Sequence, residues 1–294
     1  MRHVIATPSQ TKAILQRHGM TAKKSYGQNF LIDAGIVEKI ARSAVVSDHC
    51  AVIEIGPGIG ALTQFLCEYA AKVIAFEIDE RLPAVLADTL GEYDNVELVM
   101  EDFLQTDLSA RVEELRAQGY DVVIAANLPY YITTPILFKI FESEADIAAI
   151  TVMLQREVAD RFHAECGSKD YNALSVVTQY RCSVKQVVKV PRNVFMPRPN
   201  VDSTVLQFRF RERPQLDEAA FSAMVRACFA QRRKTILNNF ASICGGKDAA
   251  AALLQKAGID PGVRSEQLEL SAFLNLFEVY EHENRSECED QSVA

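Results

Sequence analysis

Four consecutive residues, Asn127-Leu128-Pro129-Tyr130, carry groups that could hold and orient an amine. The amide oxygen of Asn127 and the backbone carbonyl of Leu128 or Pro129 are acceptors for the two N–H groups of a planar exocyclic amine. Tyr130 could stack on the attached ring. An amine held in this way can direct its nitrogen lone pair at an electrophile. The alternative is an ordinary strand exit with an Asn-containing turn.

The stretch before this motif predicts where it lies in the fold. Val122–Ala126 is apolar and rich in β-branched residues, which indicates a buried strand. Pro129 cannot donate a hydrogen bond to a sheet, so the strand must end before it. The motif therefore follows the carboxyl end of a strand, which is where open α/β sheets bind ligands.

A glycine-rich turn, residues 56–60 (GPGIG), follows another predicted strand at Cys50–Ile55. Glycines let a backbone turn tightly and approach a ligand closely. The spacing is tighter than in a dinucleotide fingerprint and Glu54 precedes it, which disfavours NAD. The pattern favours a ligand that carries an amino acid and a nucleoside without phosphates. The alternative is a strand–helix turn whose glycines are structural.

Acidic residues close the next two predicted strands. Glu77 ends the strand at 72–77, where a carboxylate can accept both hydroxyls of a ribose, and Asp102 follows the strand at 96–100, where it can accept from an adenine amine. Each alone could be a solvated acid at a strand end. Acids at two successive strand ends, with Asn127 at another, are harder to obtain by chance.

Strands and helices alternate between residues 34 and 126, which predicts an α/β fold with a parallel, doubly wound, Rossmann-like sheet. Further strands are predicted at 148–154, 183–190 and 203–210, and helices at 11–18, 34–45, 61–69, 81–90, 110–117, 136–143, 155–163 and 172–181.

Only helical patterns follow the predicted boundary at Arg211–Pro214: 218–229, 235–241, 248–257 and 270–280. We therefore predict a ligand-binding catalytic domain at 1–211, a small all-helical domain at 212–280, and an acidic disordered tail at 281–294.

The composition is that of a globular protein with a sizeable core, because 49% of the 294 residues are hydrophobic and 24% are charged. No apolar run suits a membrane span or a signal peptide, which predicts a cytoplasmic protein. The seven scattered cysteines form no CxxC pair, which predicts reduced thiols and no metal site. The net charge of −8 disfavours nucleic acid at first sight, but residues 278–294 carry −5 of it.

Three further stretches narrow the interpretation: KKSYGQNFLID at 23–33, FMPRPNVDS at 195–203 and FAQRRKT at 229–235. Together with the motifs above, they resemble class I S-adenosylmethionine-dependent methyltransferases that act on adenine N6. More narrowly, residues 23–277 are similar to the ribosomal RNA adenine N6-dimethyltransferase family, and most closely to its bacterial 16S rRNA branch.

The resemblance implies S-adenosylmethionine as the cofactor. Its expected binding residues are Gln28, Asn29, Leu31, Gly56, Gly58, Glu77, Ile78, Asp102, Phe103 and Asn127.

The resemblance also assigns the target base and the RNA. Asn127 and the backbone of Leu128 and Pro129 would hold the target N6, and Tyr130 and Phe195 would sandwich the base. The residues expected to contact RNA are Lys23, Lys24, Arg198, Arg232, Arg233 and Lys234, of which the last three are predicted to form a basic cluster on a helix. Any one of them could equally be a solvated surface cation.

The function expected from the resemblance is N6,N6-dimethylation of two adjacent adenosines in the 3′-terminal hairpin of 16S rRNA during small-subunit biogenesis. The expected partner is 16S rRNA or the small ribosomal subunit, bound by a monomer that needs no metal and no membrane. The alternatives are a 23S rRNA adenine N6-methyltransferase of the macrolide-resistance type, a catalytically silent ribosome-assembly factor and, more distantly, an NAD oxidoreductase.

Overall fold

A computed structural model describes residues 3–20, 29–128, 130–143, 145–212 and 216–292. The chain divides into two compact units: residues 1–159 with 184–210, and residues 160–183 with 211–294.

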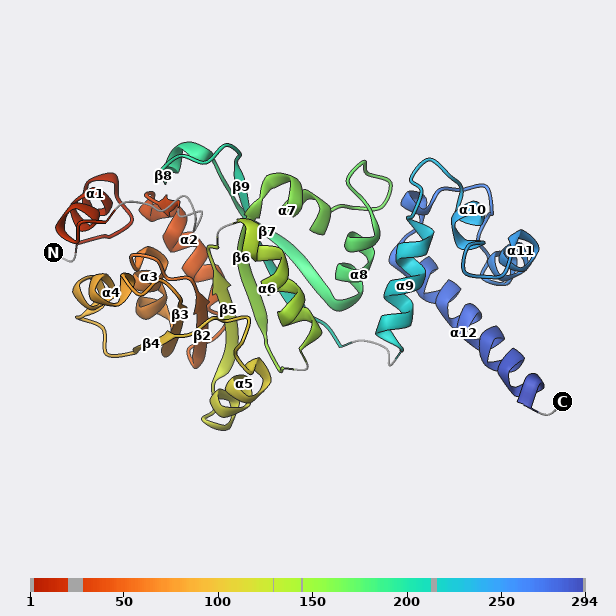
Figure 1. The fold of residues 1–294 in the computed structure, drawn as a ribbon, viewed down its shortest axis with the longest axis horizontal. Coiled ribbons are helices and arrows are strands. Elements are labelled where there is room, and N and C mark those ends of the chain that lie inside the picture. The colour runs from red at the N-terminus through yellow and green to blue at the C-terminus, as the bar shows by residue number, and fades with distance from the viewer. Residues whose placement is uncertain (1–2, 21–28, 129, 144, 213–215, 293–294) are drawn as a thin grey trace. The chain divides into compact units, whose positions relative to one another are not determined.

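A seven-stranded sheet forms the centre of the first unit (Figure 1). Strands β2 to β6 run parallel to one another, and β9 runs antiparallel to β6. In spatial order the strands are β4 (Val96–Met100), β3 (Lys72–Glu77), β2 (Cys50–Ile55), β5 (Asp121–Ala126), β6 (Ala149–Gln155), β9 (Ser203–Phe210) and β7 (Cys182–Val190). The predicted doubly wound α/β sheet is confirmed.

Helices cover both faces of this sheet, as its apolar strands require (Figure 1). Helices α2 (Ala34–Ala44), α3 (Ala61–Tyr69) and α4 (Leu82–Leu90) share one hydrophobic core with Val52, Val73 and Val123 of the sheet. Helices α5 (Leu108–Ala117) and α6 (Tyr130–Glu142) pack against β5 and β6 on the other face. The remaining helices of this unit are α1 (Pro8–Arg17), α7 (Arg156–Phe162), of which the last residues lie in the second unit, and a 3₁₀ turn at Arg192–Val194.

The strand order creates a crevice at one edge of the sheet. From the central β2 the chain moves outward to β3 and β4, and it then returns to β5 on the other side of β2. The strands end nearly level, because Ile55 pairs with both Phe76 and Ala126. Ligands bind where the strand order reverses in this way.

A two-stranded sheet of β1 (Phe30–Leu31) and β8 (Phe195–Met196) lies outside the large one. Leu31 pairs with Phe195, and the N–H of Ile32 donates to the carbonyl of Val194 at 2.9 Å. The sequence analysis described the second segment only as a proline-broken loop, since two residues are too few to show a strand periodicity.

The second unit is helical and has its own aromatic core. It contains α8 (Ala173–Arg181), α9 (Glu218–Cys228), α10 (Ile236–Phe240), α11 (Lys247–Lys256), a 3₁₀ turn at Ser265–Gln267 and α12 (Leu270–Ser292). The predicted division fell at residue 211, whereas the structure also groups residues 160–183 with these helices. Tyr180 of α8 packs on Phe221 of α9 with ring centroids 5.1 Å apart, which the chain order does not reveal.

Two helices differ in extent from the prediction. Helix α6 begins at Tyr130 rather than 136 and includes Pro135, and the burial of Thr133 and Ile136 accompanies this longer helix. Helix α12 continues to Ser292, across the stretch that we predicted to be a disordered tail. Within that extension, Glu283 accepts from Lys256 of α11 at 2.7 Å.

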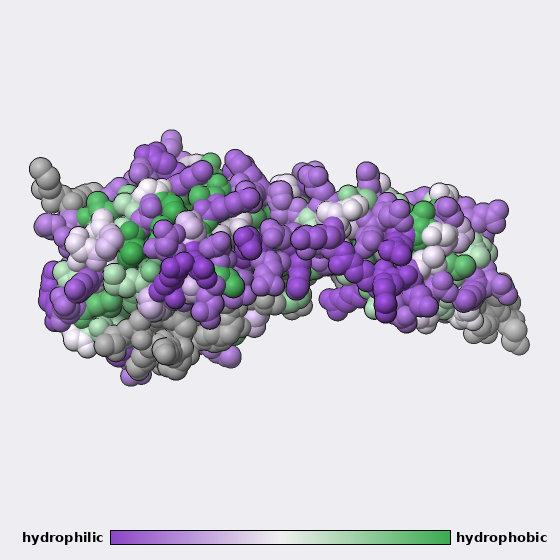
Figure 2. Space-filling model, turned by 90° about the horizontal axis from the view of Figure 1, so that it is seen from above, coloured by the Kyte–Doolittle hydropathy of each residue, from purple (hydrophilic) through white to green (hydrophobic). Residues whose placement is uncertain are grey.

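Hydrophilic side chains cover most of the face drawn in Figure 2, and hydrophobic ones form separate patches. Among the described residues, the large hydrophobic side chains that are exposed are Ile78, Met100 and Phe138. No helix in the described part of the chain has both the length and the hydropathy needed to cross a membrane.

Candidate active site

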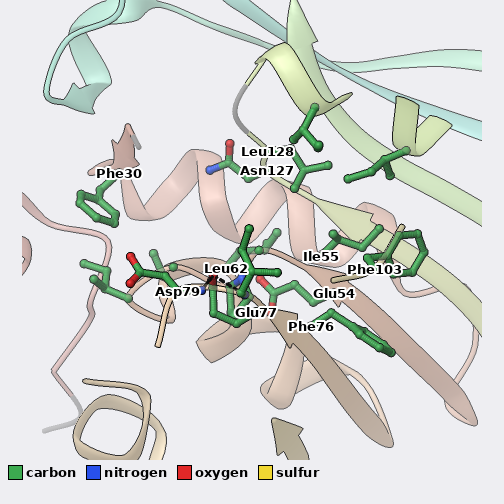
Figure 3. A pocket seen from close by; sticks show the side chains of 18 of the residues that line it. Phe30, Glu54, Ile55, Leu62, Phe76, Glu77, Asp79, Phe103, Asn127 and Leu128 are labelled. Carbon is green, nitrogen blue, oxygen red and sulfur yellow. Dashed lines mark hydrogen bonds between the residues drawn. The ribbon is translucent and has the colours of Figure 1, made fainter. Parts of the chain in front are cut away.

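A pocket lies at the carboxyl ends of β2, β3, β4 and β5, within the first unit (Figure 3). Asn127 and Leu128 lie on one side of it, and Glu54 and Glu77 lie across from them in this view. The lining residues are Asn29, Phe30, Leu31, Glu54, Ile55, Gly56, Pro57, Gly58, Ile59, Ala61, Leu62, Phe76, Glu77, Ile78, Asp79, Glu101, Asp102, Phe103, Asn127, Leu128, Ile132, Ile136 and Phe195.

The glycine turn forms one wall of the pocket. Gly56 and Gly58 both have positive φ, +70° and +57°, a region that L-residues with side chains rarely adopt. A Cβ atom on Gly56 would lie 3.2 Å from Leu128, and one on Gly58 would lie 3.6 Å from the ring of Phe30. A side chain would therefore strain the backbone at both positions, and at Gly56 it would also crowd Leu128.

Glu77 is preorganised by the backbone. It is only 7% exposed, and its Oε1 atom accepts from the N–H groups of Ile78 and Asp79 at 2.8 and 2.9 Å. Burial raises the pKa of this carboxyl, and the backbone N–H groups act in the opposite direction. The adjacent Asp79 is held by Arg81, whose Nε donates to Oδ1 at 2.8 Å. Glu77 is thus a fixed acceptor at the end of β3.

The loop after β4 supplies a second carboxylate and an aromatic ring. Asp102 is exposed and lines the pocket, and its Oδ1 accepts from the N–H of Leu104 at 2.9 Å. Phe103 is 3% exposed and packs edge-on against Phe76, with ring centroids 5.6 Å apart.

Asn127 follows the last residue of β5 and is half-buried at the pocket. Its side chain has no hydrogen-bond partner among the described residues, so its acceptor is available to a ligand from their side. Leu128 is 7% exposed and lines the same pocket. Pro129 lies outside the described residues, as does the side chain of Tyr130, whose backbone begins α6.

The small sheet brings two distant segments to the pocket. Asn29 and Leu31 come from the segment before α2, and Phe195 comes from β8, which pairs with β1. Phe195 is 5% exposed and belongs to the core of the first unit. Gln28 lies outside the described residues. Ile78 lines the pocket and is 54% exposed.

Glu54 is a buried acid in the pocket wall. It is 1% exposed, and its Oε2 atom has no hydrogen-bond partner among the described residues. Burial raises the pKa of Glu54 to about 8, and the nearby Glu77 adds to this shift. Burial thus favours the protonated form of Glu54, which stands beside a second carboxyl, Glu77, whose pKa burial also raises.

The residues predicted to bind RNA are not in the pocket. Arg198 is exposed in the first unit, and Lys23 and Lys24 lie outside the described residues. The predicted helix for the other three is wrong, because Arg232, Arg233 and Lys234 lie in the turn between α9 and α10.

The three cations of this turn also differ in their contacts. The guanidinium of Arg232 donates to Glu266 at 3.1 Å and to the carbonyl of Lys169. The side chains of Arg233 and Lys234 are exposed and have no partner among the described residues. The three cations are adjacent in the sequence, but the side chain of Arg232 is already bound by residues of its own unit.

Several pocket residues were not assigned from the sequence. Phe30 stands between the predicted Asn29 and Leu31, and Asp79 stands two residues after Glu77. Their closeness in the sequence to predicted site residues is the one signal that could have identified them. The apolar residues contributed by helices, namely Leu62, Ile132 and Ile136, carry no signal that separates them from core residues. Among the described residues, no group of three or more His, Cys, Asp or Glu side chains could hold a metal ion.

The arrangement suits a ligand with several polar parts. Fixed carboxylates at the ends of β3 and β4 can accept hydroxyl and amine hydrogens, the glycine turn permits close approach, and Phe103 and Ile78 offer apolar surface. An amide acceptor at the end of β5 faces the same space. A nucleoside-bearing ligand and a second amine could therefore meet here.

Comparison with known proteins agrees with this chemistry. The sequence model of a family described as ribosomal RNA adenine dimethylase matches residues 19–282. The ribosomal RNA small subunit methyltransferase A of Shouchella clausii is 49% identical over 278 residues, covering 92% of this chain and 94% of that protein. The protein of the same name from Geobacillus thermodenitrificans is 48% identical over 283 residues, covering 94% and 97%.

Two solved structures share the fold over most of the chain. A 23S rRNA methyltransferase, ErmE, has a TM-score of 0.69 at 30% identity, covering 85% of this chain and 98% of its own. A dimethyladenosine transferase from Plasmodium falciparum has a TM-score of 0.73 at 27% identity, covering 86% and 98%.

Proposed function

The chain belongs to the ribosomal RNA adenine dimethylase family, and on this premise we propose that it dimethylates N6 of two adjacent adenosines in the 3′-terminal hairpin of 16S rRNA. It is an rRNA adenine N6,N6-dimethyltransferase that uses S-adenosylmethionine. The relatives named for the small ribosomal subunit are 48–49% identical to it, whereas the 23S rRNA enzyme is 30% identical.

One observation carries the site assignment: Glu77, Asp102 and Asn127 lie at the carboxyl ends of three different strands and line one pocket beside the glycine turn. In the proposal Glu77 accepts the ribose hydroxyls of the cofactor, while Asp102 accepts from its adenine amine beside Ile78 and Phe103. Gly56 and Gly58 leave room for the cofactor, and Gln28, Asn29 and Leu31 complete its site. The bound cofactor supplies an electrophilic methyl group on sulfur.

The target adenine must leave its stack to reach this pocket. Its N6 lone pair is delocalised into the ring, so the amine is a poor nucleophile. In the proposal Asn127 and the backbone carbonyl of Leu128 or Pro129 accept from N6, which favours a more pyramidal nitrogen aimed at the methyl group. Tyr130 and Phe195 sandwich the base. The rate then comes mainly from positioning and electrostatics, and water can take the released proton.

The wider proposal is a cytoplasmic monomer that acts during small-subunit biogenesis and binds 16S rRNA or the small subunit without a metal. The RNA contacts are assigned to Lys23, Lys24 and Arg198 of the first unit and to the basic turn at 232–234. The exposure of Arg233 and Lys234 supports their part in it, because phosphate contacts need accessible cations.

A methyl-transfer assay tests the proposal directly. The full chain and radiolabelled S-adenosylmethionine are offered unmethylated small subunits, 23S rRNA and duplex DNA separately, and the labelled nucleosides are identified. We expect dimethyladenosine from the small subunit alone. An Asn127→Ala variant, checked for cofactor binding, is the matched negative control.

The other outcomes are equally informative. Label in 23S rRNA would replace the proposed substrate with that of a resistance-type enzyme. Tight binding to the small subunit without any label would identify an assembly factor that has lost the chemistry.

A further inference from the structure

The loop at residues 101–107, between β4 and α5, carries two of the pocket residues, Asp102 and Phe103. Its internal bonds are local: the hydroxyl of Thr106 donates to Glu101 at 2.9 Å, and Asp102 accepts from the N–H of Leu104. One oxygen of Asp102 is thereby used, and Oδ2 has no partner among the described residues. These bonds shape the loop but do not connect it to the opposite side of the pocket.

A single lysine on α6 makes that connection. The ammonium of Lys139 donates to the carbonyl of Leu104 at 2.8 Å and to the carbonyl of Thr106 at 2.6 Å. Lys139 is half-buried and does not line the pocket. Hydrogen bonds from a charged donor are stronger than neutral ones, and two of them fix both the distance and the orientation of the loop.

The same helix reaches the other side of the pocket. Helix α6 begins three residues after Asn127, and it contributes Ile132 and Ile136 to the pocket lining. Lys139 lies on this helix, one turn beyond Pro135. The lysine therefore ties the loop that carries Asp102 to the helix that continues from the amine-holding motif.

We propose that Lys139 is a positioning residue that holds the 101–107 loop where Asp102 can read the purine amine of the cofactor. This inference rests on the proposed function, because it takes S-adenosylmethionine as the ligand. A hydrogen bond weakens steeply when its geometry is lost, so a loop displaced by about 1 Å no longer offers Asp102 to the amine. Lys139 acts through the loop and touches neither substrate nor cofactor.

A purely structural tie makes a different prediction. Loss of such a tie lowers the melting temperature and weakens every ligand of the pocket alike. Loss of a positioning contact weakens recognition of one ligand group in particular. Base discrimination separates the two, because hypoxanthine presents a carbonyl where adenine presents its amine.

The variant Lys139→Met removes the two hydrogen bonds and keeps an unbranched side chain. Lys39→Met is the matched control, since Lys39 is an exposed lysine on a helix of the same unit, α2, and is not part of the pocket. Lys139→Arg keeps the charge and several donors, and it tests for rescue. Circular dichroism melting establishes that each variant is folded before binding is measured.

Isothermal titration of the full chain with S-adenosylhomocysteine and S-inosylhomocysteine gives the decisive ratio. We expect wild type and Lys39→Met to prefer the adenine ligand by roughly 30-fold, in the range for the loss of one hydrogen bond to a charged group. Lys139→Met should bind the adenine ligand about 10-fold more weakly and the inosine ligand nearly unchanged, so that the preference falls to about 3-fold. Lys139→Arg should give an intermediate ratio.

An unchanged ratio in Lys139→Met, or an equal loss for both ligands, would overturn the positioning role. Equal binding of the two ligands by wild type would also overturn it, because there would be no amine recognition to position. If wild type binds neither ligand, the proposed function fails as well, which distinguishes that failure from failure of the lysine's role alone.

Discussion

Two acidic side chains at the sheet edge are buried, whereas the cationic side chains in the turn between α9 and α10 are exposed. At the sheet edge, Glu54 and Glu77 are 1% and 7% exposed, and Glu77 is fixed by two backbone N–H groups. In the turn, Arg233 and Lys234 are exposed and project from irregular backbone. Of these cations, Arg232 alone has partners among the described residues, namely Glu266 and the carbonyl of Lys169.

This difference corresponds to two kinds of recognition. A small cofactor is read by a few directional contacts, which must be held in place away from water. An RNA backbone is bound by summed positive charge, and exposed flexible cations are sufficient for that. Substitutions at the sheet edge should therefore act through geometry and those in the turn through charge and salt.

The largest effect is expected at Asn127. Asn127→Ala should lower methyl transfer by about 10³-fold or more, since a preorganised polar contact to the reacting group is lost. Affinity for S-adenosylhomocysteine, measured by titration, should weaken only moderately, because Glu77 and Asp102 remain. Wild-type turnover by this variant would remove Asn127 from the reaction.

The pH dependence of stability should reveal the burial of Glu54, since the exposed cations of the turn are not expected to change it. Burial raises the pKa of Glu54 from 4.5 to about 8, so the folded protein keeps a proton that the unfolded chain releases. The contribution of this carboxyl to the free energy of unfolding is fully present below about pH 4.5, and it is lost as the pH rises to about 8. Glu54→Gln cannot ionise at this position, so its free energy of unfolding relative to that of wild type should rise across that window, by on the order of 4 kcal/mol.

Thermal unfolding of wild type and Glu54→Gln at several pH values between 5 and 8 measures this difference. The variant pair cancels the contribution of every other titrating group. A constant difference in melting temperature across the window would show that Glu54 ionises normally in the folded protein.

Glu77 should control cofactor affinity rather than the chemical step. Glu77→Gln removes the charge of an acceptor fixed at the end of β3, so the dissociation constant for S-adenosylhomocysteine should rise roughly 10- to 100-fold. Glu97→Gln on β4 is the control, because Glu97 is an exposed acid that pairs with Lys72. If both variants bind alike, the preorganisation of Glu77 serves no ligand.

Charge reversal in the turn should act through salt. Arg233→Glu with Lys234→Glu should weaken small-subunit binding about 10-fold and reduce the salt dependence by about two phosphate contacts. Lys247→Glu, at the start of α11, controls for a general change of charge. A loss of affinity that does not vary with salt would contradict the electrostatic reading.

The smallest effect is expected at Arg232. Its side chain is 59% exposed and paired with Glu266, and exposed ion pairs stabilise a fold only weakly. Arg232→Ala should lower the melting temperature by no more than about 3 °C, read by circular dichroism. If Arg232→Ala weakened RNA binding as much as Arg233→Glu with Lys234→Glu does, Arg232 would also be an RNA contact.

The sequence predicted most of the sheet because its strands are strongly patterned. Cys50–Ile55 and Lys72–Glu77 are apolar runs followed by glycines or acids, and their predicted bounds agree with β2 and β3. The same logic identified the strand-end positions 77, 102 and 127, since parallel strands bring their carboxyl ends to one edge.

Other features had no local signal. The pairing of Leu31 with Phe195 joins residues 164 positions apart through two-residue strands, and nothing in either segment specifies its partner. The same is true of the lysine on α6, whose spacing from Leu104 is 35 residues. Such contacts depend on how the helices and strands pack against one another, so local sequence patterns do not predict them.

The sequence by itself determined the order of the elements, the class of fold and the chemical groups at the strand ends, because these depend on local periodicity and on residue type. Only the tertiary structure decided which of these groups face one pocket, that Glu54 is buried without a partner for Oε2 among the described residues, and that Arg232 is bound within its own unit. Burial and pairing arise between segments far apart in the chain. The pKa of Glu54 is shifted, and the guanidinium of Arg232 is paired, only once those segments are packed together.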